Sequence, residues 1–319
     1  MESIHEFWFW LPNKLDVALF GVLALSFLAG GFALLRLAFP KVAAIALTTA
    51  KWAWFQPLFW VILVMGSLAL WLFTWIPYST FGEDLKMYKE TCLTLVMLLS
   101  IILAVWTASV SIADELEGKT ALTVLSKPIG RRQFVFGKFL GVLAPAYTLF
   151  VLLGIMFLSA ISYKVPYDAR ETSNPTPENA QIKAEVESTV APLVLAFFET
   201  VVLTSITIAI STRLPMLPNL VICFSVYVLG HLTPLLVQSS IGEFRLVRFM
   251  GQFIATVLPV LDHFKSDAAI AAGRMMRGPG GFATVVPWDY VAQAFVYTLL
   301  YSTIAMLVSL LLFEDRDLA

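Results

Sequence analysis

The sequence predicts an all-α, polytopic membrane protein, in which transmembrane helices are joined by polar loops. Its 319 residues are 59% hydrophobic and only 13% charged, and the mean hydropathy is +0.83. Soluble globular chains carry about 45–50% apolar and about 25% charged residues. So little charge cannot cover a water-facing surface, which excludes an ordinary soluble enzyme and a disordered chain. The net charge of −1 also lacks the basic excess of a nucleic-acid-binding protein.

The second observation is a series of long apolar stretches. A spanning helix needs about 20 mostly apolar residues, because each residue rises about 1.5 Å across a core of about 30 Å. Seven stretches meet this length: Val17–Phe39, Pro57–Pro77, Cys92–Ile112, Phe139–Tyr163, Val190–Thr212, Leu217–Gln238 and Trp288–Phe313. The tail before the first stretch is acidic, with Glu2, Glu6 and Asp16, which is the wrong charge for a signal peptide. We therefore expect a retained first helix.

The orientation follows from Lys and Arg near the span ends, because cytoplasmic loops carry an excess of these residues. Basic residues lie in the connector Phe39–Gln56, in the segment Ile112–Phe139 and at Arg213. These segments are predicted to lie inside, which gives an outside N-terminus and an inside C-terminus.

The loop Ser239–Pro287 does not follow this rule. It holds five basic residues, yet the number of spans before it places it outside. One explanation is that long loops obey the charge rule only weakly. The alternative is that Leu217–Gln238, which is interrupted by Gly230 and Pro234, does not fully cross the membrane.

Two polar segments are expected on the outer side. Lys164–Thr189 contains three prolines and a net acidic charge, so we expect a flexible cap in which Ala180–Ser188 could form a short helix. The second segment, Ser239–Pro287, contains the apolar run Phe249–Leu261, which is too short to span and is typical of a re-entrant or interfacial segment. A glycine-rich connector follows this run.

The inner segment Ser111–Gly141 contains the most informative pattern. Asp114, Glu115 and Glu117 are expected to open a short helix, where acidic residues complement the helix dipole. One apolar stripe is predicted from Leu116, Thr120, Leu122 and Leu125. Pro128 ends the helix. The pattern predicts an amphipathic helix beneath the membrane that docks a soluble partner, or an ordinary interfacial linker.

The same segment also forms a motif with a fixed order of residues. It consists of Glu115, Glu117, Thr120, the run Leu125-Ser126-Lys127-Pro128-Ile129, Arg131 and Gly137-Lys138. Weaker signals are the ending Phe313–Leu318 and the run Leu258–Phe264. Together they resemble the type-2 (ABC-2) permeases of ATP-binding cassette transporters.

The resemblance implies a six-span permease half in the cytoplasmic (inner) membrane. It would form a homo- or heterodimer with a second permease half, and a separate ATPase subunit would dock on its inner face. The docking residues implied are Glu115, Glu117, Thr120, Leu122, Leu125, Pro128 and Arg131. Residues 1–56 would add an extra N-terminal helix and an inner connector to the permease domain 57–319, with the docking helix at 113–137.

We expect no nucleotide, cofactor or metal site in the chain itself. Gly118-Lys119-Thr120 matches the end of a phosphate-binding loop, but Ala113 stands where the first glycine is needed. The hydrolysis of ATP is therefore expected in the partner, and this chain is not expected to be an enzyme. Cys92 and Cys223 lie in apolar runs and are predicted to be small core residues.

Two ionisable residues lie inside predicted spans. Glu199 is midway through the fifth span, where a carboxylate costs about 2.5–3.5 kcal/mol on insertion scales, so it needs a protein partner. It could contact a substrate or proton in a translocation pathway, or it could be a protonated residue bonded to nearby Ser or Thr side chains. His231 in the sixth span could titrate in the same pathway or cap a break in the helix.

Two functions of different classes follow. The first is the permease subunit of an ATP-driven transporter, for an unknown substrate. The second is a non-transporting membrane anchor or activator of an ATPase in an assembly or maturation system. Ion-driven secondary transport fits the composition but does not explain the inner motif. Sensitivity of transport to Glu199→Gln would distinguish the first two.

Overall fold

The computed structural model describes residues 2–76, 84–117, 130–171, 179–238, 249, 258–265, 276–277 and 284–314. Its long helices are α1 (Glu2–Ala38), α2 (Pro40–Phe55), α3 (Pro57–Trp75), α4 (Asp84–Glu117), α6 (Arg131–Glu171), α7 (Asn179–Ser211), α8 (Met216–Gln238) and α11 (Trp288–Glu314). A 3-10 turn, η2 (Leu261–Phe264), and two short antiparallel strands, β1 (Met276–Arg277) and β2 (Thr284–Val285), complete it. The prediction of an all-α, polytopic membrane protein is confirmed.

Six described helices are long and apolar enough to cross a membrane, namely α1, α3, α4, α6, α7 and α11. The seventh predicted span is α8, whose described side chains form the shorter apolar stretch Met216–Leu232. The whole of α8 has 23 residues, which corresponds to about 34 Å at about 1.5 Å per residue. This length is enough to cross a hydrocarbon core of about 30 Å.

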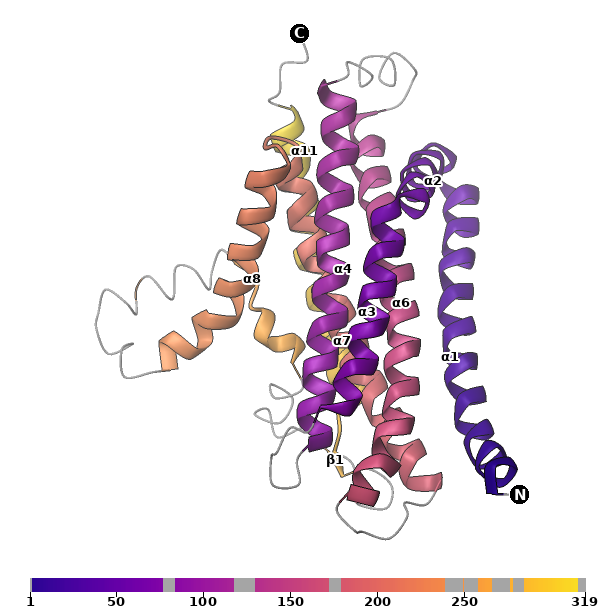
Figure 1. Ribbon diagram of the computed structural model, residues 1–319. Helices are drawn as coiled ribbons and strands as arrows, with labels where there is room; N and C mark the ends of the chain where they lie inside the picture. Colours follow the sequence, from indigo (N-terminus) through magenta and orange to yellow (C-terminus); the bar gives the residue numbers. More distant parts are fainter. Residues whose placement is uncertain are drawn as a thin grey trace.

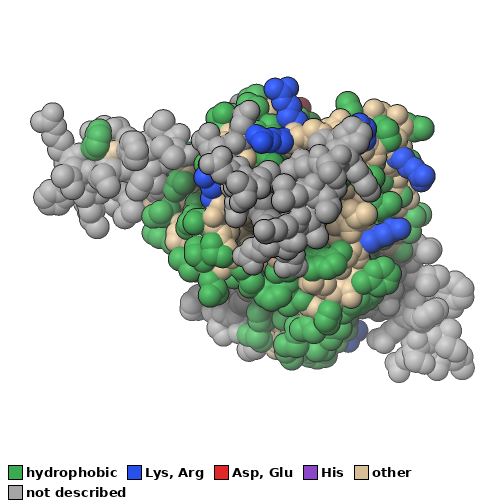
Figure 2. Space-filling model, turned by 90° about the horizontal axis from the view of Figure 1, so that it is seen from above, with side chains coloured by type: hydrophobic (Ala, Val, Ile, Leu, Met, Phe, Trp, Pro, Cys, Tyr) green, Lys and Arg blue, Asp and Glu red, His purple; other side chains and the backbone are tan. Residues whose placement is uncertain are grey.

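The start of α1 and the end of α11 lie at opposite ends of the bundle, as an odd number of crossings would require (Figure 1). Figure 2 views the upper end, where Lys and Arg side chains surround the face and few described Asp or Glu side chains are visible. The helix ends at this end of the bundle carry six exposed basic residues, namely Arg36, Lys41, Lys51, Arg131, Arg132 and Arg213. Their gathering favours this end as the inner one.

Helix α2 lies across the upper end of the bundle and is seen almost end-on in Figure 1. Its buried residues are Val42, Ala43, Ala46, Thr49, Ala50 and Ala53, which share one face of the helix. This face packs on α6 at two glycines. A Cβ added at Gly141 would lie 2.7 Å from Cβ of Thr49, and one at Gly137 would lie 2.8 Å from Cβ of Ile45. The two backbones approach so closely because α6 has no side chain at these positions.

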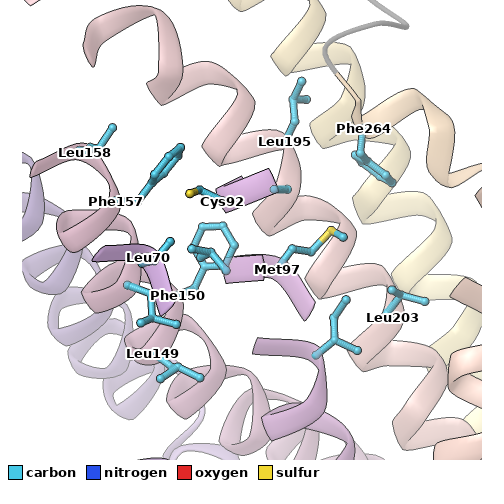
Figure 3. Close-up of a cluster of buried hydrophobic side chains, with 14 of the residues drawn as sticks. Leu70, Cys92, Met97, Leu149, Phe150, Phe157, Leu158, Leu195, Leu203 and Phe264 are labelled. Atoms are coloured by element: carbon cyan, nitrogen blue, oxygen red, sulfur yellow. The ribbon is translucent and has the colours of Figure 1, made fainter. Parts of the chain in front are cut away.

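The hydrophobic core lies between α3, α4, α6 and α7 (Figure 3). Leu70 of α3, Cys92 of α4, Phe157 of α6 and Leu195 of α7 are fully buried there. Cys92 therefore packs as a small apolar residue, as predicted. Cys223 of α8 is also buried, with its Sγ 3.2 Å from Oγ1 of Thr207.

The structure differs from the sequence-based expectation in the outer segment Lys164–Thr189. Most of it is helical, because α6 continues to Glu171 and α7 begins at Asn179. The flexible cap expected there is therefore wrong for residues 164–171, whereas the short helix expected over Ala180–Ser188 is confirmed as the start of α7. The buried Lys164 explains part of the difference, since its Nζ donates to the carbonyl of Thr74 at 3.0 Å and pairs with Asp168 at 3.0 Å.

A second difference concerns the start of the inner segment. Asp114, Glu115 and Glu117 were expected to open a separate helix, but α4 continues without a break to Glu117. Nothing in Ala113–Glu117 interrupts a helix, since no Gly or Pro occurs there. These acidic residues therefore belong to the last turns of α4 rather than to the first turn of a new helix.

Candidate functional site

A cavity of about 310 Å³ lies between α4, α7, α8 and the η2 turn. Its wall is made by Glu90, Leu93, Thr94 and Met97 of α4, Pro192, Ala196 and Glu199 of α7, Tyr227 and His231 of α8, and Phe264 and Lys265 at η2. The volume is at the lower end of the range of about 300–1,000 Å³ that small-molecule sites occupy. The wall combines five apolar side chains with four ionisable ones, Glu90, Glu199, His231 and Lys265.

The two ionisable residues singled out in the sequence meet in this cavity. Helices α7 and α8 form a hairpin whose turn joins Ser211 to Met216. Glu199 precedes Ser211 by twelve residues and His231 follows Met216 by fifteen, which are rises of about 18 and about 22 Å. The two side chains therefore lie at similar depths, and Nε2 of His231 is 3.5 Å from Oε1 of Glu199.

The two ring nitrogens of His231 face different groups. Nδ1 of His231 lies 3.1 Å from the carbonyl oxygen of Tyr227, and a carbonyl can only accept a hydrogen bond. Nδ1 therefore donates, and Nε2 faces the carboxyl group either as the acceptor of its proton or as its charged partner. The separation of 3.5 Å is longer than the 2.7–2.9 Å of a charge-assisted hydrogen bond.

Oε1 of Glu199 is buried and has no hydrogen-bond partner among the described residues. Only 2% of the residue is exposed. Such an oxygen carries a desolvation cost of about 1–3 kcal/mol, or more for a charged group. The nearby Thr200 and Thr204 do not relieve it, because their hydroxyls donate to carbonyls of their own helix. The site therefore contains an acceptor that is free to bind a donor.

The η2 turn closes one side of the cavity by packing on α8 and α11. A Cβ added at Gly230 would lie 2.8 Å from Cδ1 of Leu261, so only glycine lets the turn approach α8 this closely. The backbone N–H of Val260 donates to Oη of Tyr297 at 3.0 Å, and Oη of Tyr290 donates to the carbonyl of His263 at 2.7 Å. These contacts place Phe264 and Lys265 on the cavity wall.

A polar contact joins three helices between the cavity and the inner end. Nδ2 of the buried Asn219, at the start of α8, donates to Oγ of Ser109 at 2.7 Å and to Oγ of Ser211 at 2.6 Å. Hydrogen bonds between helices contribute about 0.6 kcal/mol on average in membranes. Asn219 therefore links α4, α7 and α8 on the inner side of Glu199.

The helices that flank the inner segment are joined to each other near its ends. The buried Nζ of Lys138 on α6 donates to the carbonyl of Ser111 on α4 at 3.1 Å. On α6, the ring of Phe134 stacks on Phe313 of α11 with centroids 5.6 Å apart. The inner ends of α4, α6 and α11 are thus held together as one unit.

The predicted docking residues are only partly described. Glu115 and Glu117 lie on the last turns of α4, and their side chains are outside the described residues, as are Thr120, Leu122, Leu125 and Pro128. Arg131 is the first residue of α6 and is exposed. Among the described residues, no group of three or more His, Cys, Asp or Glu side chains is placed to hold a metal ion.

Several residues of the cavity and its surroundings were missed by the sequence reasoning. Glu90 lies outside the predicted span, and Lys265 lies in a segment whose position the sequence does not indicate. Asn219 resembled an ordinary residue at a helix start. The similar depth of Glu199 and His231 could have been found by counting residues from the α7–α8 turn.

A family model described as "ABC-2 family transporter protein" matches residues 43–318. The matched region begins in α2 and includes every later helix, while α1 lies outside it. No curated protein matches the chain.

Proposed function

The chain belongs to the ABC-2 family of transporter proteins, and we propose that it moves its substrate across the cytoplasmic membrane by a conformational change that a separate ATPase subunit drives. Residues 57–319 would be the permease domain, with six spans formed by α3, α4, α6, α7, α8 and α11. α1 would be an added span, and α2 would be the inner connector. A second permease half, identical or different, would complete the transporter.

The continuity of α4 is the observation that carries this proposal. The helix has 34 residues, which corresponds to about 51 Å. It runs from Glu90 and Met97 on the cavity wall to the inner segment that carries the family motif. A rigid helix of this length transmits a displacement at its inner end to the cavity. An ATPase that moves the inner segment would therefore change the shape of the cavity.

The contact between Lys138 and Ser111 supports this mechanism. It holds the inner end of α6 to α4, so the two helices that flank the segment would move together. Gly137 and Gly141 add α2 to the same unit through their close packing. The docked ATPase would thus act on three helices at once, and its energy would not be lost in local bending.

Within the inner segment, we assign the roles that its residue types suit. Glu115 and Glu117 would make polar contacts with the ATPase, and Leu122 and Leu125 would fill an apolar groove on it. Thr120 would hydrogen-bond at the same surface. Pro128 would fix the angle of the segment, and the exposed Arg131 would contact the ATPase at the start of α6.

The docking proposal is tested by co-purification. The chain is co-expressed with an ATP-binding cassette subunit encoded in its genomic neighbourhood, and the amount of ATPase retained on the tagged chain is measured. We expect the double variant Glu115→Lys/Glu117→Lys to lose most of the ATPase. The control is Glu187→Lys, an exposed position on α7 near the opposite end of the bundle. Equal retention by both variants would contradict the docking assignment.

The cavity supports transport as the task of this assembly. We propose Glu199 and His231 as residues of the pathway, because they meet on the cavity wall. In vesicles that contain both subunits, Glu199→Gln is expected to reduce substrate-stimulated ATP hydrolysis at least tenfold. A chain that served only as a membrane anchor would retain normal ATPase activity with this variant, and that result would exclude Glu199 from the pathway.

A further inference from the structure

The chemistry of the cavity wall indicates which ligand would fit it, and this inference rests on the proposed transport function. The first requirement is set by Glu199. Glu199 lies on the wall, and its Oε1 is buried and has no hydrogen-bond partner among the described residues. An oxygen of a carboxyl group in this state is best satisfied by a donor, and a cationic donor gives the stronger, charge-assisted bond.

The second requirement is set by the apolar part of the wall. Leu93, Met97, Pro192 and Ala196 supply aliphatic surface, while Tyr227 and Phe264 supply aromatic rings. Aromatic faces attract cations in addition to packing against apolar groups. The wall therefore suits a ligand that combines a positive charge with an apolar body.

The third requirement is the balance of charge. Two carboxyl groups, Glu90 and Glu199, line the cavity together with one lysine, Lys265. Nζ of Lys265 lies 3.7 Å from Oδ1 of Asp262, so its charge is already partly compensated. When Glu199 is ionised and His231 is neutral, Glu199 adds a negative charge to the wall. In this state the wall favours a cation over an anion.

The cavity is accessible from the side on which its wall residues are exposed. Thr94 and Lys265 are exposed, whereas Met97 and Glu199 are buried. The cavity therefore has an exposed rim and a buried inner wall. A ligand that enters past the rim would place its body among the apolar side chains and its polar group against Glu199.

We propose that this cavity binds an amphipathic organic cation, a small molecule with one protonated amine and an apolar body, whose ammonium group donates to Oε1 of Glu199. The apolar body would pack between Met97, Tyr227 and Phe264. The volume of about 310 Å³ restricts the body to a small one, such as a single aromatic ring with a short chain. The substrate of the transporter would then belong to this class.

The test uses three probes of similar size that differ in their polar group: phenethylammonium, 2-phenylethanol and 3-phenylpropanoate. Binding to the full-length chain in lipid nanodiscs is measured by equilibrium dialysis with radiolabelled probes. We expect saturable binding of phenethylammonium at one site per chain. Its affinity should exceed that of the alcohol at least tenfold, and the carboxylate should not bind.

Variants connect the binding to the carboxyl group. Glu199→Gln keeps the shape of the side chain and should weaken phenethylammonium binding at least tenfold. Glu199→Asp keeps the charge and should restore part of the affinity. Glu187→Gln, at an exposed position away from the cavity, is the matched control and should bind as the unmodified chain does. Size-exclusion chromatography and thermal unfolding establish that each variant is folded.

Three results would overturn the proposal. Equal affinity for the ammonium and the alcohol would show that the cavity binds only through its apolar side chains. Preferred binding of the carboxylate, lost in Lys265→Gln, would make the cavity an anion site. The absence of saturable binding of all three probes would exclude this ligand class.

The transport proposal has a separate readout in the co-purification of the ATPase. Amine binding by a chain that retains no ATPase would contradict the transport proposal alone. A retained ATPase without amine binding would contradict the ligand class alone.

Discussion

The contact between α2 and α6 leads to a quantitative prediction for Gly141→Ala. The added Cβ would lie 2.7 Å from Cβ of Thr49 and 2.9 Å from the carbonyl oxygen of Ala46. Carbon atoms pack at about 3.5–4.0 Å, so α2 must move away by about 1 Å. One of the two atoms that clash belongs to the backbone, so a change of rotamer cannot relieve the contact.

The cost of this overpacking is about 1–3 kcal/mol. Alanine also favours a helix over glycine by about 0.8–1.0 kcal/mol, which offsets part of the cost. The matched control is Gly30→Ala in α1, where nothing lies within 4 Å of the added Cβ. It has the same gain in helix propensity without the clash, so the difference between the two variants isolates the contact with α2.

The assay is thermal unfolding of both variants in the same detergent. For domains of 150–250 residues, 1 kcal/mol corresponds to about 2–4 °C in Tm. We therefore expect Gly141→Ala to unfold roughly 2–12 °C below Gly30→Ala. Equal Tm values for the two variants would refute the close packing of α2 on α6.

Three further predictions concern polar contacts between helices, each measured by Tm. Lys138→Met removes the donor to the Ser111 carbonyl and should cost about 1.5–3 kcal/mol; an unchanged Tm would contradict this link. Asn219→Leu removes two bonds between helices and should cost about 1–2 kcal/mol; an unchanged Tm would show that the three helices do not depend on this contact. Lys89 of α4 pairs with Glu185 of α7. Lys89→Met should therefore destabilise more than Lys89→Met/Glu185→Leu, because the single change leaves a carboxylate unpaired.

Hydropathy was sufficient to predict the spanning helices because the lipid environment imposes a simple rule. Each helix that crosses must be long and apolar, and the rule does not depend on its neighbours. The inner connector expected at Phe39–Gln56 covers almost the same residues as α2. Helix ends were less predictable. α4 and α6 extend well beyond their apolar stretches, because water-exposed turns carry no hydropathy signal.

The cavity could be predicted only in part. The sequence indicated that Glu199 and His231 need partners, since ionisable groups inside spans are costly. It did not indicate that they are partners of each other, because this depends on how α7 and α8 are rotated. The position of η2 depends on Gly230, where an added Cβ would lie 2.8 Å from Cδ1 and Cγ of Leu261. This contact between distant segments left no local pattern.

The close packing of α2 on α6 also has a consequence for the bilayer. α2 has 16 residues, so a rod of about 24 Å is attached across the inner end of α6. If α6 tilts during transport, this rod must press into the head-group layer or lift from it, which displaces lipids. The membrane then acts as a mechanical load on the cycle. Its thickness and lateral pressure would shift the balance between conformations without any ligand at the cavity.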